Sequence, residues 1–404
     1  MMRLLISLLV LTLCNLASAE TLLVFGDEVW TMNGKELIKD GYVLIKDGRI
    51  AEVGPASNAT PDGTERILRG RIVTPGLVDA HTCVGLAGHL NSDHDRDELD
   101  RTTSIQPHLR AIDAYNPHER LIEWVRGFGV TTMHTGHAPQ ALVSGQTMLV
   151  KTTGNRVEDA TIRPRAMIAC SLSDTAIREK SPGSRAKAFA MLRQRLLDAA
   201  HHDRQMTQSD TEEAKPPKPD LELEALASVL RGETPLLIHA HRARDIANAL
   251  RLKREFDIPI VLDGAAEAHL MIDELKEADI PVFIHPTMIR PYGECENLSF
   301  ETASKLIKAG IPVAMQSGYE SYVPRTRVVL YEAGMAAANG CSREEAMRMI
   351  TIEPARILGI DERVGSIEIG KDGDLAIYDG DPFEWTTHCT GVVIDGSVVS
   401  DQPR

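Results

Sequence analysis

Short apolar runs alternate with longer amphipathic stretches through the middle of the chain, and this alternation restricts the fold more than any other feature. Stretches of helical period, such as "SRAKAFAMLRQRLLDAA" and "ARDIANALRLKREF", lie between several of the runs. Eight strand–helix units in series predict an α/β protein with a (β/α)8 TIM barrel, whose chemistry sits at the carboxyl ends of the strands. The runs that predict the eight strands are residues 72–79, 130–134, 147–152, 165–171, 235–240, 259–263, 281–285 and 312–317.

Both ends of the chain have a pattern different from the middle. Residues 20–71 and 362–404 contain short alternating runs separated by turn residues, among them "VLIKDGRIAEVG" and "VVIDGSVV". An Asp-Gly step between two such runs is typical of a β-hairpin. We expect the two ends to pair into one small composite β-sandwich domain, which leaves residues 72–361 for the barrel.

One segment interrupts the rhythm of the barrel. Residues 201–222 are polar, charged and rich in proline, which predicts a mobile surface insertion. The pair His201 and His202 at its start is expected to lie on a solvated helix end, with a metal-binding pair as the alternative.

The first nineteen residues have the pattern of a secretory signal peptide. Arg3 precedes an apolar run, and "ASA" precedes Glu20. Lipoprotein processing at Cys14 is the alternative, but Leu13 stands where such sites have a small residue. No later apolar run approaches the ~20 residues of a membrane span. We therefore expect no membrane span and an exported protein, periplasmic or secreted.

Charge and cysteine content exclude two classes of protein. The formal net charge of −14 argues against a nucleic-acid partner. The chain has six cysteines, of which one leaves with the signal peptide, and the remaining odd number has no paired spacing. We expect at least one free thiol and no disulfide scaffold.

Several motifs resemble the metal-dependent amidohydrolase superfamily, in particular its exported imidazolonepropionase-like and prolidase-like branch. They include "RIVTPGLVDAHTCVG", "LLIHAHRARDIANALRLKREF" and "TIEPARILGIDERVGSIEIGKDGDLAIYDGDP". The resemblance implies hydrolysis of a C–N bond in a small amide, cyclic amide or dipeptide-like substrate. It also implies one or two divalent ions, usually zinc, that activate a water molecule at the mouth of the barrel.

The first half of the implied ligand set is only partly present. The family pattern has His-x-His after the first strand, where this chain has His81 and Cys83. Cys83 is either a zinc ligand or a small buried core residue. Lys151 at the end of the third strand is the candidate for the bridging ligand. Its alternatives are a lysine that reaches solvent and one whose charge partly replaces an ion.

Of the metal ligands implied after the fifth, sixth and eighth strands, two are replaced by glycine. His239 matches the ligand position after the fifth strand, and His241 lies two residues on, with its side chain on the same side. The sixth-strand histidine corresponds to Gly264, and the eighth-strand Asp, ligand and base at once, corresponds to Gly318. Glu320 is the candidate to replace that Asp.

Two histidines near these positions are expected to play other roles. His269 lies five residues after Gly264 within the following helix, where a supporting or packing role is expected. His285 ends the seventh strand, which supplies no ligand in the family, so we expect a core histidine.

Two functions remain open. In the first, His81, Cys83 and His239, with or without Lys151, hold one zinc ion, and His241 or Glu320 steers the water or the developing oxyanion. In the second, the chain binds no metal and is an inactive homologue that binds a small amide-like ligand or an active amidohydrolase. A dimer is expected, possibly with that homologous active chain. The loop 85–112, with His89, His94, Asp95 and His108, is expected to select the small molecule.

Overall fold

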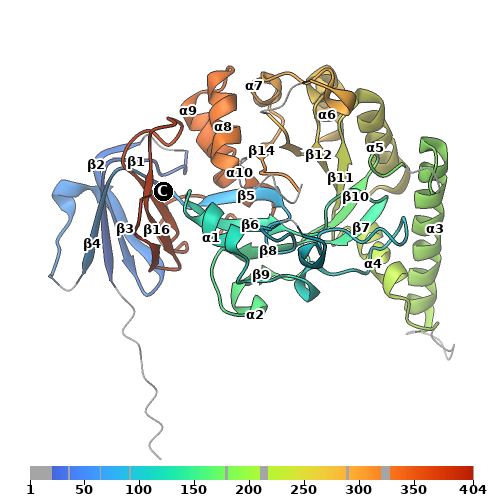
Figure 1. Cartoon of the computed structure of the whole chain (residues 1–404), viewed down its shortest axis with the longest axis horizontal. Coiled ribbons are helices and arrows are strands. Elements are labelled where there is room, and N and C mark those ends of the chain that lie inside the picture. The colour runs from blue at the N-terminus through green and yellow to red at the C-terminus, as the bar shows by residue number, and fades with distance from the viewer. Residues whose placement is uncertain are drawn as a thin grey trace, which may run out of the picture.

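Figure 1 shows a computed structural model of the chain, in which a β-rich unit lies beside a larger unit of strands surrounded by helices. It describes residues 21–34, 37–63, 65–90, 92–177, 181–209, 217–287, 291–319 and 328–403. The predicted signal peptide, residues 1–19, lies outside the described residues. Among the described helices, none combines the length and the apolar character needed to cross a lipid bilayer.

The β-rich unit is built from both ends of the chain, as blue and red strands in one sheet show (Figure 1). Its seven strands lie in the order β17-β16-β15-β4-β1-β2-β3, so it is one continuous sheet. Strand β4 joins the two ends, since it pairs in parallel with β1 and antiparallel with β15. The bounds are β1 Leu22–Val29, β2 Ile38–Lys46, β3 Arg49–Pro55, β4 Arg66–Pro75, β15 Leu375–Tyr378, β16 Cys389–Ile394 and β17 Ser397–Ser400.

The larger unit contains the eight predicted strands in the form of a ring. Six strands pair in the order β14-β13-β12-β11-β10-β7, and four pair in the order β5-β6-β8-β9. Strands β7 and β8 follow each other in the chain, and Gly318 bridges Thr82 in parallel beyond the end of β14. The predicted TIM-barrel fold is therefore confirmed. The bounds are β5 Leu77–Thr82, β6 Val130–Thr135, β7 Val143–Gln146, β8 Met148–Lys151, β9 Thr161–Arg163, β10 Ile168–Ser171, β11 Leu236–Ala240, β12 Ile260–Gly264, β13 Val282–Ile284 and β14 Val313–Met315.

The direction of the third barrel strand differs from the prediction. The strand formed by β7 and β8 is antiparallel to both of its neighbours, β6 and β10. Only residues 136–142 connect β6 to β7. A parallel crossover needs a dozen or more residues, so a connection this short returns the chain in the opposite direction.

Helices cover the outside of the barrel (Figure 1). Helix α5 is amphipathic and buries Ile246, Ala249 and Leu250 while its basic residues stay outside. Helix α4 begins where the Asp220 carboxylate accepts the backbone N–H groups of Glu222 and Leu223, each at 3.0 Å. The bounds are α1 Arg120–Arg126, α2 Val157–Ala160, α3 Arg185–Ser209, α4 Leu221–Leu230, α5 Ala243–Phe256, α6 Ile272–Ala278, α7 Thr302–Lys308, α8 Val329–Ala338, α9 Arg343–Arg348 and α10 Ile352–Ile357.

The expected insertion at residues 201–222 is helical at both of its ends. Helix α3 continues to Ser209 and α4 begins at Leu221, while residues 210–216 lie outside the described residues. An ion pair joins Arg231, which caps α4, to Asp203 on α3 at 2.5 Å. His202 is buried in this packing and His201 is exposed. At both ends of this stretch, therefore, the polar residues lie on helices that pack against each other and not in a loop.

Candidate active site at the mouth of the barrel

Four neighbouring strands place an apolar residue inside the barrel and a polar residue two positions later, at the mouth. Side chains two residues apart on a strand point to the same side, so the two members of each pair lie one above the other. The apolar members pack in one cluster, and the polar members are all buried. The pairs are Leu237 and His239 on β11, Val261 and Asp263 on β12, Phe283 and His285 at β13, and Ala314 and Gln316 at β14.

Asp263 lies at the centre of the polar layer. Its carboxylate is 3.1 Å from Nδ1 of His81 and 2.8 Å from Nδ1 of His239, and it accepts Nε2 of Gln316 at 2.6 Å. Burial alone would raise the pKa of Asp263, but the two histidines hold that pKa well below its usual range. An ionised carboxylate only accepts hydrogen bonds, so both Nδ1 atoms carry a proton in this arrangement.

The remaining ring nitrogens of these histidines have different surroundings. The hydroxyl of Tyr319 lies 2.7 Å from Nε2 of His239, and it is the hydrogen-bond donor when the ring is neutral with its proton on Nδ1. The Tyr319 ring lies 6.1 Å from the His81 ring. Nε2 of His81 is buried and has no hydrogen-bond partner among the described residues. His81 therefore has a ring nitrogen without a hydrogen-bond partner among the described residues, whereas Nε2 of His239 is occupied by the Tyr319 hydroxyl.

Cys83 directly follows β5. Its sulfur donates to the backbone carbonyl of Tyr319 at 3.0 Å. The side chain is fully buried and packs with Ala87, Ala138 and Tyr319. Of the two roles considered for Cys83, the geometry favours the buried core residue.

Gly264 makes room for the neighbouring imidazoles. A Cβ atom at this position would lie 2.6 Å from Cε1 of His239 and 2.9 Å from Cε1 of His241. The backbone of Gly264 has φ +83°, which favours glycine. The rings of His239 and His241 meet edge to face with their centres 4.5 Å apart. The space that a sixth-strand histidine would need is thus filled by the fifth strand.

Gly318 also has a conformation that favours glycine, with φ +92°. Its backbone N–H donates to the carbonyl of His81 at 3.3 Å and so ties the eighth strand to the first. Residue 320 lies outside the described residues, so the hypothesis that Glu320 replaces the missing Asp stays a prediction.

The prediction that Lys151 is a bridging metal ligand is wrong. Because β8 runs antiparallel, Lys151 pairs with Thr132 near the amino end of β6, away from the mouth. Its ammonium group forms ion pairs with Asp374 at 2.5 Å, Asp372 at 3.0 Å and Asp395 at 3.2 Å. Burial lowers the pKa of Lys151, but the three carboxylates outweigh it and the pKa is raised. Lys151 joins the barrel to the β-rich unit.

Two other histidines considered above, and His134, which was not, have separate positions. His285 lies in the polar layer with its ring 6.4 Å from that of Tyr319, and it is buried. His269 is within 3.2 Å of the Thr302 hydroxyl, a contact between α7 and the turn before α6. His134 bonds to the Ala80 carbonyl and to Thr147, and burial lowers its pKa to about 3, so it is neutral.

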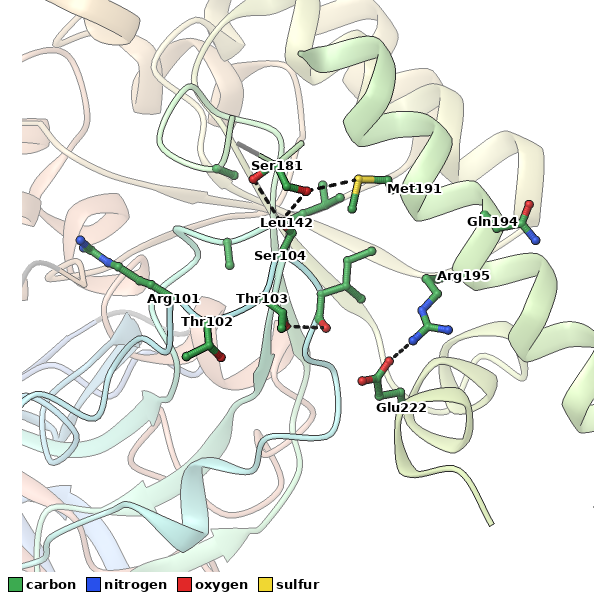
Figure 2. Close-up of a pocket in the computed structure, with 13 residues that line it drawn as sticks. Arg101, Thr102, Thr103, Ser104, Leu142, Ser181, Met191, Gln194, Arg195 and Glu222 are labelled. Atoms are coloured by element: carbon green, nitrogen blue, oxygen red, sulfur yellow. Dashed lines mark hydrogen bonds and ion pairs between the residues drawn. The ribbon is translucent and has the colours of Figure 1, made fainter. Parts of the chain in front are cut away.

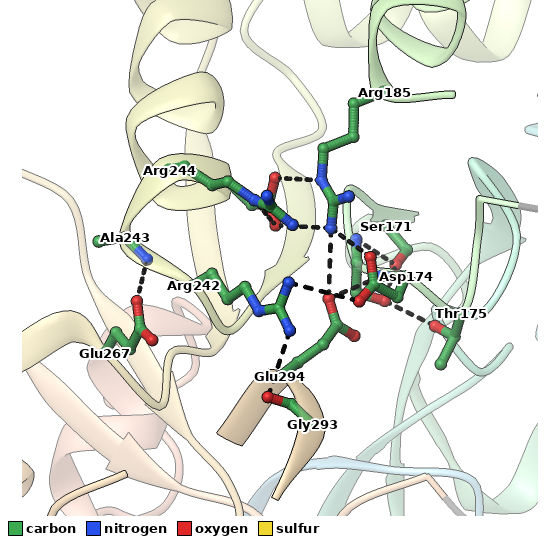
Figure 3. A network of polar contacts seen from close by, with 12 residues as sticks. Ser171, Asp174, Thr175, Arg185, Arg242, Ala243, Arg244, Glu267, Gly293 and Glu294 are labelled. Carbon is green, nitrogen blue, oxygen red and sulfur yellow. Dashed lines mark hydrogen bonds and ion pairs between the residues drawn. The ribbon is translucent and has the colours of Figure 1, made fainter. Parts of the chain in front are cut away.

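A network of arginines and carboxylates borders the mouth at β10 and β11 (Figure 3). Arg185 pairs with Asp174 and, at 2.8 Å, with Asp245. Arg242, next to His241, donates to the Gly293 carbonyl at 3.3 Å. Glu294 accepts the backbone N–H of Asp174 at 2.7 Å, and burial raises its pKa. These contacts fix residues 293–294 at the edge of the mouth.

One further group of possible metal ligands lies in the loop after β5. Ligand atoms of His89, Asp95 and Glu119 lie within 4.8 Å of one another, and no other group of three His, Cys, Asp or Glu side chains does so in the described part of the chain. Glu119 already accepts the backbone N–H groups of His89 at 2.9 Å and Leu121 at 3.1 Å, where it caps α1. This group contains two residues of the loop that was expected to select the ligand.

Sequence reasoning missed three residues of the mouth: Asp263, Gln316 and Tyr319. Asp263 was visible as the last residue of the predicted strand 259–263, where the inward alternation from Val261 places it beside His239. Tyr319 follows Gly318, and only the folded chain brings its hydroxyl to His239.

Comparison with known proteins agrees with this architecture. The sequence model of a family described as "Amidohydrolase family" matches residues 175–400. Amidohydrolase tasK of Hapsidospora irregularis is 26% identical over 90% of this chain, which spans only 40% of the length of that relative. Imidazolonepropionase of Thermoplasma acidophilum is 24% identical, with 89% of this chain and 87% of the enzyme covered. The crystal structure of an amidohydrolase from Thermotoga maritima is 28% identical with a TM-score of 0.88, and covers 94% of this chain and 100% of that one.

Proposed function

The chain belongs to the amidohydrolase family, part of a superfamily of metal-dependent hydrolases of C–N bonds, and from this premise we propose that it is a metal-free member. In this proposal the barrel is kept and the mouth no longer performs metal-assisted hydrolysis. The observation that carries it is the position of Asp263, whose carboxylate binds Nδ1 of both inherited histidines.

The side chains at the mouth offer too few free ligand atoms for a zinc ion, and they already bind a protein carboxylate. Zinc in a catalytic site takes three protein ligands and an open position for water. Among the described residues, His81 offers one open nitrogen, while Nε2 of His239 accepts the Tyr319 hydroxyl and the Cys83 sulfur faces a carbonyl group. These atoms do not make a three-ligand set, so we derive no reaction step through a metal.

Binding is the function that such a barrel retains. The polar layer at the mouth is pre-formed, and the network around Arg242 limits the opening. We propose that the exported chain binds a small amide-like molecule, or a homologous active amidohydrolase in a mixed dimer, without cleaving a C–N bond itself.

The test is a hydrolysis assay on the mature chain with added Zn²⁺, Co²⁺ or Mn²⁺. The substrates are N-acyl amino acids, Xaa-Pro dipeptides and cyclic amides. The proposal expects rates no higher than those of the His81→Ala variant with every metal. A metal-dependent rate that His81→Ala and His239→Ala both abolish would refute it.

A second candidate, hydrolysis with a single zinc ion, is favoured by the open Nε2 of His81. It requires the Tyr319 hydroxyl to leave Nε2 of His239 and Cys83 to turn toward the mouth. It also lacks the Asp base, whose loss typically costs about 10²–10⁴-fold in rate. In this candidate Cys83→Ala abolishes zinc uptake, so unchanged metal content in that variant would remove it.

A further inference from the structure

Three possible metal ligands lie together beside the loop after β5, and none of them belongs to the polar layer of the mouth. Ligand atoms of His89, Asp95 and Glu119 lie within 4.8 Å of one another. Glu119 is buried, and the other two side chains are half-buried. Nδ1 of His89 lies 3.4 Å from Oε1 of Glu119. The ligands come from two segments, the loop and the residue before α1, so the fold itself brings them together.

Backbone hydrogen bonds hold the two sides of this loop against each other. The N–H of Gly88 donates to the Asp95 carbonyl at 2.7 Å, and the N–H of Asp97 donates to the Leu86 carbonyl at 2.9 Å. A Cβ atom on Gly88 would lie 1.4 Å from Oδ2 of Asp95, so the carboxylate occupies the space that a side chain at residue 88 would need. Glycine at this position therefore lets the Asp95 carboxylate lie close to the backbone next to His89.

The two carboxylates of this cluster have little positive charge near them. Among the described residues, Asp95 forms no ion pair and Glu119 pairs only with His89. The backbone N–H groups of His89 and Leu121 both donate to Oε1 of Glu119, and Oε2 accepts no hydrogen bond in the part of the chain that the structure describes. Two carboxylates this close disfavour each other's charge unless a cation lies between them. The cluster thus combines negative charge with carboxylate oxygens that are available to a cation.

The ligand atoms select the kind of cation. One imidazole nitrogen and two carboxylate oxygens suit Zn²⁺, which binds such atoms at about 2.0–2.2 Å and completes its four ligands with water. Those distances put the ligand atoms about 3.3 Å apart, so each pair has to close by no more than about 1.5 Å around the ion. Ca²⁺ takes about 6–8 oxygen ligands, more than this cluster offers.

We propose that His89, Asp95 and Glu119 bind one Zn²⁺ ion, which ties the loop after β5 to the start of α1. The chain runs on from this loop to residues 101–104, which line a pocket of about 890 Å³. Figure 2 shows these residues on one side of the pocket, and α3 with Glu222 of α4 on the other. The ion therefore fixes the segment that leads into one wall of the pocket. The metal-free state proposed above concerns the mouth, and this site uses none of the histidines there.

Zinc binding by the mature chain tests the proposal. The protein is stripped with a chelator, and ZnCl₂ is added in isothermal titration calorimetry. The wild type is expected to bind one ion per chain with a Kd below about 10 µM. His89→Ala and Asp95→Asn should each weaken this binding at least about tenfold, because each removes one of three ligands. The controls His201→Ala and Asp273→Asn change exposed residues on α3 and α6, and should bind zinc as the wild type does.

A further variant tests the geometry without removing a ligand. The Cβ atom of Gly88→Ala displaces the Asp95 carboxylate, so zinc binding should weaken at least about tenfold. Gly54→Ala is the matched control, because its Cβ would make only an ordinary contact, 3.6 Å from the Tyr42 ring. It should leave zinc binding unchanged. Circular-dichroism melts check that every variant folds.

Two kinds of result would overturn the proposal. It fails if the wild type binds fewer than about half an ion per chain, or if folded His89→Ala, Asp95→Asn or Gly88→Ala binds zinc as the wild type does. The first of these results leaves the metal-free mouth standing. Zinc that is kept in His89→Ala but lost in His81→Ala would place the ion at the mouth, and would refute the proposed function as well.

Discussion

At the scale of single residues, Asp263 decides how the mouth is held together. A buried carboxylate is costly unless it is paired, and here two imidazoles and one amide donate to it. The same carboxylate accepts a hydrogen bond from Nδ1 of each ring and so fixes the orientation of His81 and His239. The carboxylate of Asp263 therefore orients both histidines in the absence of an ion.

Replacement of Asp263 by alanine tests this dependence. Asp263→Ala removes the acceptor of three buried donors and should lower the free energy of unfolding by about 3 kcal/mol. Urea unfolding followed by circular dichroism measures it. The control is Glu277→Ala on the exposed face of α6, which should change stability by less than about 0.5 kcal/mol. Equal effects of the two substitutions would contradict the role of Asp263.

Gly264 offers a matched comparison with Gly310. Both glycines have a left-handed backbone, with φ +83° and +80°, but only Gly264 is crowded by histidine rings. Gly310→Ala should cost about 1–2 kcal/mol from backbone strain. Gly264→Ala should cost about 1–3 kcal/mol more, because its Cβ meets His239 and His241. Similar unfolding free energies for both variants would mean that the rings do not fill this space.

At the scale of elements, the sequence was sufficient to find all eight barrel strands but not their directions. Apolar runs and flanking prolines mark a strand locally. The direction of β7–β8 depends on the seven-residue link before it, and that signal was overlooked. The consequence reached the site, because the reversed strand carried Lys151 to the opposite end of the barrel. Tyr319 could not be found from the sequence, because only the folded chain brings it to His239. Asp263 was overlooked although the alternation from Val261 places it beside His239.

Lys151 should be essential to the junction between the barrel and the β-rich unit. Lys151→Met leaves Asp374 buried without its cation, while Asp372 keeps Arg49 and Arg363, and should lower the free energy of unfolding by about 3–5 kcal/mol. Lys276→Met on the exposed face of α6 is the control, with an expected change below about 0.5 kcal/mol. Chemical denaturation at pH 7 gives both values. A loss below about 1 kcal/mol would show that the cluster is not needed.

The effect of Lys151→Met should also depend on pH. Burial alone would raise the pKa of Asp372. The nearby Lys151 and Arg363 lower it by more than burial raises it, so the pKa in the folded state lies below the usual range. A carboxyl with a depressed folded pKa stabilises the protein above its unfolded pKa of about 3.9, and that stability is lost as the pH falls through the folded value. The part of the difference between wild type and Lys151→Met that comes from Asp372 should therefore shrink below about pH 4. Burial raises the pKa of Asp374, so the part that comes from Asp374 should begin to shrink at a higher pH. A difference that stays constant from pH 7 to pH 3 would contradict this origin.

At the scale of the whole molecule, the chain has the family fold, and our proposal is that its metal-ligand positions have changed. Gly264 and Gly318 fit the backbone conformations at their positions, Cys83 packs in the core, and Asp263 binds the two remaining histidines. These contacts hold the described residues of the mouth in place. If the proposal is right, this chain keeps the amidohydrolase fold without the metal chemistry of that family.

The central claim is tested most directly by the metal content of the mature protein after dialysis against Zn²⁺. Mass spectrometry of the elements measures it for the wild type, His81→Ala and His89→Ala. We expect no ion that depends on His81, and any zinc that is lost in His89→Ala belongs to the loop after β5. One or two ions per chain in the wild type that disappear in His81→Ala would contradict the claim.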